Sequence, residues 1–137
     1  MLSLEYIAGL FDGEGHVSIT ATKRRSGTDP KLTVRLTNTF LPIIREIQHM
    51  YGGHIYKARK VKEHYLQVYV LSLTVEESKK FLSDILPFLH IKRDQATYAL
   101  KFSSTVYRRG KGRVTDEERL IRKECMQSIY ADKRKQF

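Results

Sequence analysis

Two glycines four residues apart, inside the first apolar stretch of the chain, constrain its fold more than any other feature. The stretch runs Ile7-Ala8-Gly9-Leu10-Phe11-Asp12-Gly13-Glu14-Gly15. A glycine inside a helix costs about 1 kcal/mol relative to alanine, so a pair on one helical face indicates a packing reason, most simply backbone contact with a second helix. Ser3 is placed to cap this helix, and Glu5 falls in its first turn, where the dipole favours an anion. We predict a helix whose glycine face touches another helix.

The predicted helix ends on an acid, Glu14. The C-terminal end of a helix exposes unpaired carbonyls and carries partial negative charge, so a carboxylate there needs a cation beside it. A hard divalent ion such as Mg²⁺ prefers oxygen ligands and would relieve this conflict. Dinucleotide-binding and P-loop motifs do not fit, because their glycines follow a strand and open a helix. Two such helices in contact could therefore hold a metal ion jointly.

Two pairs of alternating segments predict antiparallel hairpins, because short turns between strands force antiparallel pairing. The first pair covers residues 16–24 and 31–39 around a turn at 26–30, and the second covers 54–61 and 64–73. The apolar positions of these strands are expected to face a core: Val17, Ile19, Ala21, Leu32, Val34, Leu36, Leu66, Val68 and Val70.

Helices are predicted between and after the hairpins. One covers 42–51, with a proline in its first turn and Gly52-Gly53 as its stop. Capping-box patterns begin helices at Thr74 and at Thr115, which end near residues 86 and 132, and a further helix covers 93–106. We predict one α+β domain over residues 1–137, with an αββαββα core over about 1–106. A basic loop and a helix follow over about 107–137, and 133–135 form a frayed tail.

Composition points to a polyanionic partner. Lys and Arg outnumber Asp and Glu by 25 to 15, a formal charge of +10, which favours nucleic acid. No apolar run approaches membrane-spanning length, so a membrane is not expected. The single cysteine, Cys125, can form neither an intrachain disulfide nor a zinc cluster, which favours a reducing compartment. Acids interrupt the first apolar stretch and no basic leader precedes it, so we expect an intracellular protein of the cytoplasm or an organelle matrix, not a secreted one.

The polar faces of the predicted strands are the candidate nucleic-acid surface. A two-stranded ribbon fits the major groove, where short polar side chains reach base edges and Lys or Arg reach phosphates. An ordinary solvated sheet face is the alternative. For the basic segment 108–113, a phosphate contact and a solvated turn are both open. The candidate DNA contacts are Ser18, Thr20, Thr22, Arg24, Lys31, Thr33, Arg35, Tyr56, Lys60, Gln67 and Tyr69.

The glycine stretch resembles the LAGLIDADG motif of homing endonucleases, with Ile7 at the first motif position and Glu14 in the place of the metal-binding acid. One copy of the motif is present, and in that family a single-motif chain of this size is a homodimer. The resemblance implies the LAGLIDADG homing-endonuclease fold, whose antiparallel ribbons form a DNA-binding saddle. It implies dimerisation through the motif helix by Ile7, Ala8, Gly9, Leu10, Asp12 and Gly13.

The resemblance also implies the active-site residues. Residues 86–96 are similar to the family segment that supplies a catalytic lysine, here Lys92, for which a solvated lysine at a helix start is the alternative. Asn38 ends the second strand where relatives have a polar residue that organises water, and the carbonyl of Gly13 would join Glu14 as a metal ligand. A second basic residue is unplaced, because residues 40–42 are Phe-Leu-Pro; Arg45 and Arg35 are the candidates.

By this resemblance the chain is expected to be a site-specific homing endonuclease. It would cleave both strands of a long, partly palindromic double-stranded DNA site by phosphodiester hydrolysis that depends on Mg²⁺ or Mn²⁺, and so promote mobility of its host intron or intervening element. Two alternatives stay open at this point. One is an intron maturase that binds intron RNA on the same fold, and the other is a non-catalytic DNA-binding regulator.

Overall fold

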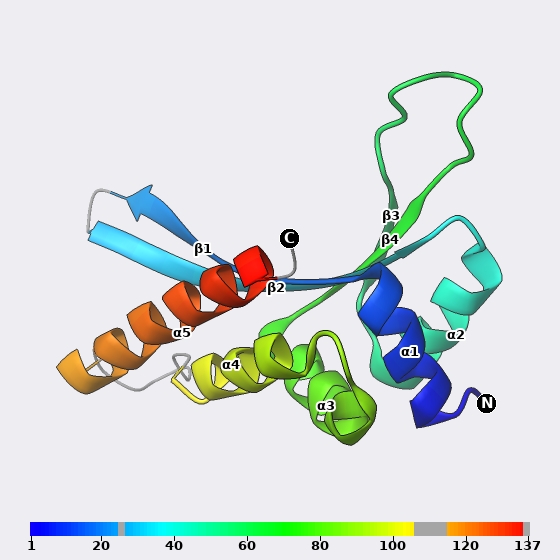
Figure 1. The fold of residues 1–137 in the computed structure, drawn as a ribbon. Coiled ribbons are helices and arrows are strands. Elements are labelled where there is room, and N and C mark those ends of the chain that lie inside the picture. The colour runs from blue at the N-terminus through cyan, green and yellow to red at the C-terminus, as the bar shows by residue number, and fades with distance from the viewer. Residues whose placement is uncertain (25–26, 106–114, 136–137) are drawn as a thin grey trace.

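A computed structural model describes residues 1–24, 27–105 and 115–135, so the basic segment 108–113 lies outside the described residues. Its centre is a four-stranded antiparallel sheet in the order β1-β2-β4-β3. Figure 1 shows that the helices gather on one side of this sheet; we call the uncovered side the open face. Within the described part of the chain, no helix is long and apolar enough to cross a membrane. The strands are β1 (Gly15–Arg24), β2 (Gly27–Asn38), β3 (His54–Lys57) and β4 (Tyr69–Leu73).

The order of elements confirms the predicted αββαββα core followed by C-terminal helices. The last helix differs from the prediction: residues 133–135 are its final turn and not a frayed tail. The helical elements are α1 (Leu4–Glu14), α2 (Leu41–Tyr51), α3 (Val75–Ile85), the 3-10 turn η1 (Leu86–Phe88), α4 (Arg93–Ser103) and α5 (Asp116–Lys135).

The junction between α1 and β1 is tightly built. The Ser3 side chain caps α1 by accepting a hydrogen bond from the Tyr6 N–H at 3.2 Å. At the other end, a Cβ on Gly15 would lie 2.3 Å from the ring of Phe11, so only glycine lets the strand leave the helix this closely. Phe11 is fully buried and packs edge-on against Phe81 with ring centroids 5.3 Å apart. The end of α1 is thereby fixed at the start of the sheet.

The first hairpin follows its predicted alternation closely. Val17, Ile19, Leu32, Val34 and Leu36 are all buried against the helices. The prediction was wrong at the turn, because β2 already begins at Gly27. Ala21, predicted to face the core, is exposed. It pairs with Pro30 toward the far end of the ribbon, beyond the strongly buried positions of both strands.

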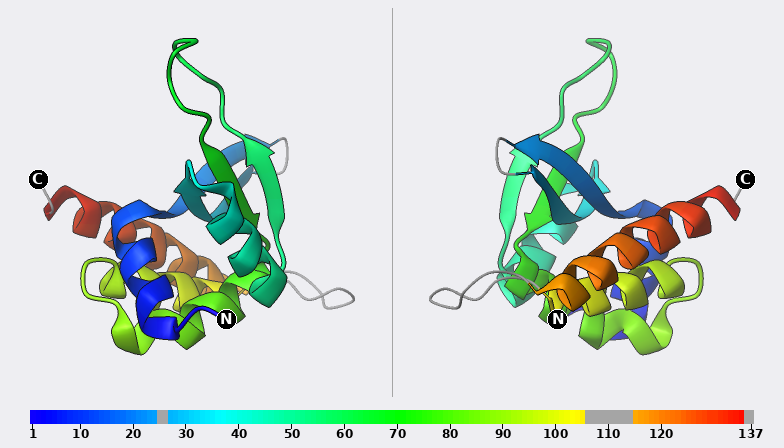
Figure 2. Two further views of the ribbon diagram at one scale, coloured as in Figure 1. Left: turned by 90° about the vertical axis from the view of Figure 1, so that its right-hand side faces the viewer. Right: turned by 90° about the vertical axis from the view of Figure 1, so that its left-hand side faces the viewer.

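The second hairpin is shorter than its alternation predicts. Figures 1 and 2 show the connection between β3 and β4, residues 58–68, projecting away from the body as a long loop. Leu66 was predicted to be buried and is 75% exposed, because no helix covers this loop. On β4 the strand register places Leu71 and Leu73 opposite the core residues Leu36 and Val34 of β2. Val70 is buried as predicted, at 5% exposed, and Val68 is half-buried. Because the neighbouring Val70 and Leu71 are both buried, burial along β4 does not follow the predicted alternation.

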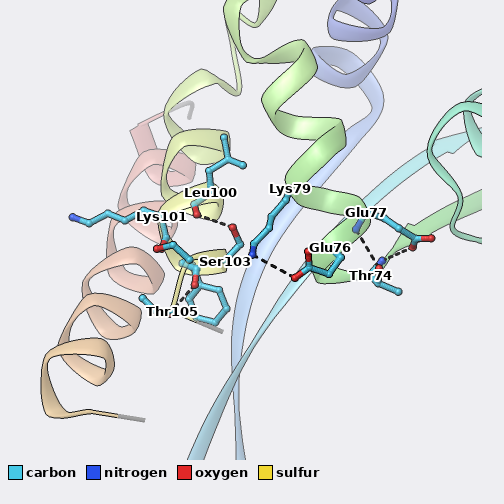
Figure 3. Close-up of polar contacts among 10 residues, drawn as sticks. Thr74, Glu76, Glu77, Lys79, Leu100, Lys101, Ser103 and Thr105 are labelled. Atoms are coloured by element: carbon cyan, nitrogen blue, oxygen red, sulfur yellow. Dashed lines mark hydrogen bonds and ion pairs between the residues drawn. The ribbon is translucent and has the colours of Figure 1, made fainter. Parts of the chain in front are cut away.

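Hydrogen bonds at the start of α3 also fix the turn that follows α2. Figure 3 shows the capping box, in which Thr74 Oγ1 accepts from the Glu77 N–H at 3.3 Å and Glu77 Oε1 accepts from the Thr74 N–H at 2.9 Å. The second oxygen of Glu77 accepts from the Gly53 N–H at 2.9 Å. Gly52 and Gly53 have φ of +84° and +105°, a region that favours glycine, so the predicted glycine stop of α2 is confirmed.

Candidate active site

The candidate catalytic acid stands where α1 meets the sheet. The Glu14 side chain is exposed, and its backbone carbonyl accepts a hydrogen bond from Thr37 Oγ1 at 3.3 Å. Asn38, the last residue of β2, is next to Thr37, so the fold brings the predicted pair Glu14 and Asn38 to the same end of the β1–β2 ribbon. Asn38 Oδ1 accepts from the Phe40 N–H at 2.8 Å. This bond fixes the Asn38 side chain and leaves its amide NH₂ as the group able to hold a water.

Asp12 organises the segment that carries the candidate lysine. Its carboxylate is 8% exposed and accepts from the backbone N–H groups of His90, Ile91 and Lys92 at 2.9, 3.1 and 2.9 Å. Charge-assisted bonds of this kind are among the stronger hydrogen bonds in proteins. Asp12 was predicted to face a second chain, but the structure turns its side chain into its own chain. It therefore fixes the loop before α4 onto the end of α1.

The Lys92 ammonium lies at the C-terminal end of α1. Its Nζ donates to the backbone carbonyl of Asp12 at 2.6 Å. The ammonium therefore balances the partial negative charge of the helix end, so the electrostatic conflict expected at Glu14 is relieved in part within the chain. Burial lowers the pKa of Lys92, and the carboxylates of Asp12 and Glu14 oppose that shift.

Further basic side chains gather beside Lys92. His16 on β1 lies directly opposite Arg35 on β2. Burial lowers the pKa of His16 below its usual value, and three cationic neighbours lower it further, in decreasing order Lys133, Arg35 and Lys92. Burial and then the charge of Lys92 lower the pKa of Lys133. No sequence pattern connects Lys133 with this group, because a run of charged residues carries no signal for a contact with a distant segment.

The structure separates the two candidates for the second basic residue. Arg35 lies in the group around His16, whereas Arg45 lies on α2 and lines a hollow with Leu41, Tyr56 and Tyr69. Arg35 is therefore the candidate that the fold brings toward Lys92.

One chain provides few ligands for a metal ion. Among the described residues, no group of three or more His, Cys, Asp and Glu side chains could hold one. The exposed Glu14 carboxylate and the carbonyl of Gly13 are hard oxygen donors of the kind that Mg²⁺ or Mn²⁺ takes, but a single chain brings only this small set. The donor chemistry fits a divalent ion if two copies of the site meet.

The glycine side of α1 is open. No atom beyond the helix itself lies within 4 Å of the position that a Cβ would take on Gly9 or Gly13, and both residues are exposed. Ile7 and Ala8, predicted as interface residues, are instead fully buried in the core of their own chain. The surface that α1 leaves available to a partner consists of Gly9, Gly13, the half-buried Leu10 and the exposed Glu5 and Tyr6.

The open face of the first hairpin carries the predicted polar and basic side chains. Strand pairing sets Ser18 opposite Thr33 and Thr20 opposite Lys31, in line with the His16–Arg35 pair. Residues directly opposite in a sheet share one face, so these six side chains form one surface. For the candidates Thr22 and Arg24, the backbone continues β1, and their side chains lie outside the described residues.

The candidates of the second hairpin are more scattered. Tyr56 is exposed and lies across from Val70 and Thr37 in the register, and Lys60 is exposed on the projecting loop. Tyr69 on β4 pairs with Asn38 and Lys57, so its side chain lies on the other side of the sheet from that of Tyr56. Both tyrosines border the hollow against α2. The amide of Gln67 donates to the Ala58 carbonyl at 2.8 Å and so bridges the two arms of the loop. Tyr69 therefore does not share the open face with the candidates of the first hairpin, and the amide of Gln67 is engaged within the loop.

Comparison with known proteins defines the class to which this fold and site belong. The family model described as LAGLIDADG endonuclease matches residues 7–104, from the start of the glycine stretch through α4. The chain belongs to the LAGLIDADG endonuclease family. A search of curated proteins finds no match.

Solved structures agree on the fold at low sequence identity. An archaeal intron-encoded homing endonuclease complexed with DNA, I-Vdi141I, is 19% identical over 96% of this chain and 82% of its own, with a TM-score of 0.68. The homing endonuclease I-TnaI is 17% identical over 97% of this chain and 95% of its own, with a TM-score of 0.67. The homing endonuclease I-CvuI, in complex with its target in the presence of Ca, is 16% identical over 94% of this chain and 78% of its own, with a TM-score of 0.64. These likenesses confirm the predicted fold class.

Proposed function

We propose that this chain is a site-specific, metal-dependent DNA endonuclease that acts as a homodimer. The observation that carries the proposal is the exposed Glu14 carboxylate at the end of the motif helix, next to the Lys92 ammonium and at the border of a polar, basic sheet face. Membership of an endonuclease family and the DNA-bound forms of I-Vdi141I and I-CvuI support DNA as the partner.

The open glycine side of α1 supports the dimer. Gly9 and Gly13 let two helix backbones approach closely, and this contact would bring the two Glu14 residues together at a two-fold axis. Two carboxylates repel each other unless a cation lies between them, so metal binding and assembly should be coupled. A two-fold dimer also favours a partly palindromic site.

Hydrolysis of a phosphodiester needs an attacking water, stabilisation of charge on the phosphoryl oxygens and help for the leaving oxygen. A divalent ion held by Glu14 and the Gly13 carbonyl would supply Lewis acidity at this position. The Lys92 ammonium, held by Asp12, would stabilise charge developing on the phosphoryl oxygens. The Asn38 amide, fixed through its bond to Phe40, would orient the water.

The test compares wild-type protein with Glu14→Gln and with the control Glu117→Gln, which removes an exposed acid on α5. The substrate is a DNA fragment that spans the uninterrupted allele of the gene hosting the reading frame. Wild type and control should cut both strands with Mg²⁺. Glu14→Gln should lower the rate at least about 100-fold, with an affinity for the fragment in Ca²⁺ within about threefold of wild type.

Three results would contradict the proposal. Full cleavage by Glu14→Gln would remove the assigned role of the acid. Tight binding by wild type without cleavage in Mg²⁺ or Mn²⁺ would leave a non-catalytic binder, and a preference for folded intron RNA over the duplex would indicate a maturase.

A further inference from the structure

We propose that Lys133, in the last turn of α5, is a further cationic group of the cleavage site, in addition to Arg35, and contacts the same DNA phosphate as Lys92. This inference rests on the proposed endonuclease function and adds a substrate contact from a helix that follows the αββαββα core. Just after Asn38, where the resemblance implied a second basic residue, the chain has Thr39, Phe40, Leu41 and Pro42.

The body of α5 is firmly attached to the rest of the chain. Cys125 and Ile129 are buried in the core, and Figures 1 and 2 show α5 running along α4 and beneath the β1–β2 ribbon. Arg122 is 8% exposed, donates from Nε to Thr105 Oγ1 at 3.1 Å and lies over the ring of Phe102. The direction of α5, and hence the place of its last turn, is fixed by this packing.

A direct contact then joins the last turn of α5 to the start of α4. Gln95, three residues after Lys92 and 1% exposed, donates from Nε2 to Asp132 Oδ2 at 3.1 Å. Lys133 follows Asp132; its charge lowers the pKa of His16, and the charge of Lys92 lowers the pKa of Lys133. The carboxylate that Gln95 holds therefore keeps the next residue, Lys133, beside the candidate active site.

The charges around Lys133 favour an anion. Within the described residues, the ion pairs under 4 Å join Met1 to Glu46, Lys79 to Glu76 and Lys80 to Asp84, and neither Lys92 nor Lys133 takes part in one. Lys92 and Lys133 are both half-buried, and both act on His16, which lies opposite Arg35 in the sheet. Like charges held together repel, and an anion among them removes that repulsion. A DNA phosphate has the charge and the acceptor oxygens for this place.

Lys133→Met tests the charge and not the packing, because methionine keeps the apolar stem. Lys135→Met is the matched control, with the same change two residues away at an exposed position, and Lys133→Arg restores the charge. Two quantities are measured on the DNA fragment used for Glu14→Gln. They are the single-turnover cleavage rate in Mg²⁺ and the slope of log affinity against log salt in Ca²⁺, with urea unfolding as the check on folding.

We expect Lys133→Met to lower the cleavage rate about 10- to 100-fold and to reduce the salt slope by about one per subunit, as the loss of a phosphate contact requires. Lys133→Arg should recover most of the cleavage rate and most of the salt slope, and Lys135→Met should change the rate less than about twofold. An unchanged slope, or equal effects of the two methionine variants, would overturn the inference. A reduced slope at full rate would place Lys133 on DNA away from the cut and also overturn it.

The two proposals fail differently. If wild type does not cleave, the endonuclease function fails, while the difference in salt slope between Lys133→Met and Lys135→Met still decides whether Lys133 contacts phosphate. If wild type cleaves and Glu14→Gln does not, a fully active Lys133→Met overturns only the role of Lys133.

Discussion

A single buried carboxylate, Asp12, connects the motif helix to the loop that carries Lys92. Its three backbone hydrogen bonds all require an acceptor, and asparagine would turn a donor amide toward N–H groups. We expect Asp12→Asn to lower the free energy of unfolding by about 2–3 kcal/mol, because charge-assisted bonds to buried groups are lost. The measurement is urea denaturation followed by circular dichroism at one fixed protein concentration, with the midpoint falling and the m-value unchanged.

Asp94→Asn is the matched control for this change. Asp94 lies in the first turn of α4 and is exposed, so its removal should cost less than about 1 kcal/mol through the helix dipole alone. An equal loss for both variants would show that the bonds of Asp12 do not hold the loop.

The residues of the site differ in how far the sequence could predict them. Glu14 follows from the local pattern of α1 and Lys92 only from the family resemblance of residues 86–96, and the structure brings both to the end of α1. Asp12 lies in the same pattern, yet its direction depends on backbone N–H groups 78 to 80 positions away, which no periodicity reveals. The position of Lys133 depends on how α5 packs against α4 and the β1–β2 ribbon, so it follows only from the tertiary structure.

At the scale of elements, nothing within a single chain explains why α1 has two exposed glycines on one face. With empty space around it, Gly9 could be replaced by leucine with a gain in helix propensity of about 0.8 kcal/mol. In a dimer built on close helix contact, the same side chain would overpack the interface twice, at about 1 kcal/mol or more per copy. We therefore expect Gly9→Leu to weaken dimerisation at least about 30-fold, measured by sedimentation equilibrium.

Ser83→Leu adds the same side chain at an exposed position on α3 and should leave the dimer unchanged. Thermal unfolding should show that Gly9→Leu still folds. A dimer as strong as that of wild type would mean that the chain does not associate through the glycine side of α1.

Elements with a strong local signal were predicted well. The capping box at Thr74, the glycine stop of α2 and the alternation of the first hairpin all agree with the structure. The second hairpin was predicted less well. Alternation indicates a strand only where one face is covered, and residues 58–68 have no helix over them. Coverage is a property of the assembled domain, so the sequence pattern alone could not show where β3 ends and β4 begins.

At the scale of the whole molecule, the sheet divides the basic charge between an open face and a helix-covered side. If Lys31, Arg35 and Lys60 each contact one phosphate, a dimer makes about six such contacts, and its affinity for duplex DNA should fall about 1,000-fold between about 50 and 200 mM salt. Fluorescence anisotropy with a labelled duplex measures this dependence. Changing these three residues together to glutamine should remove most of the slope, because the released counterions belong to the contacted phosphates.

The matched control separates surface contact from net charge. It changes an equal number of exposed lysines on the helix layer to glutamine, namely Lys80, Lys101 and Lys123. Both triple variants lower the formal charge of +10 by the same amount, so long-range attraction is reduced about equally in the two. Only the variant that lacks Lys31, Arg35 and Lys60 should lose salt dependence. Equal weakening by both would mean that the chain attracts DNA through its overall charge, without laying the β1–β2 ribbon along the phosphates.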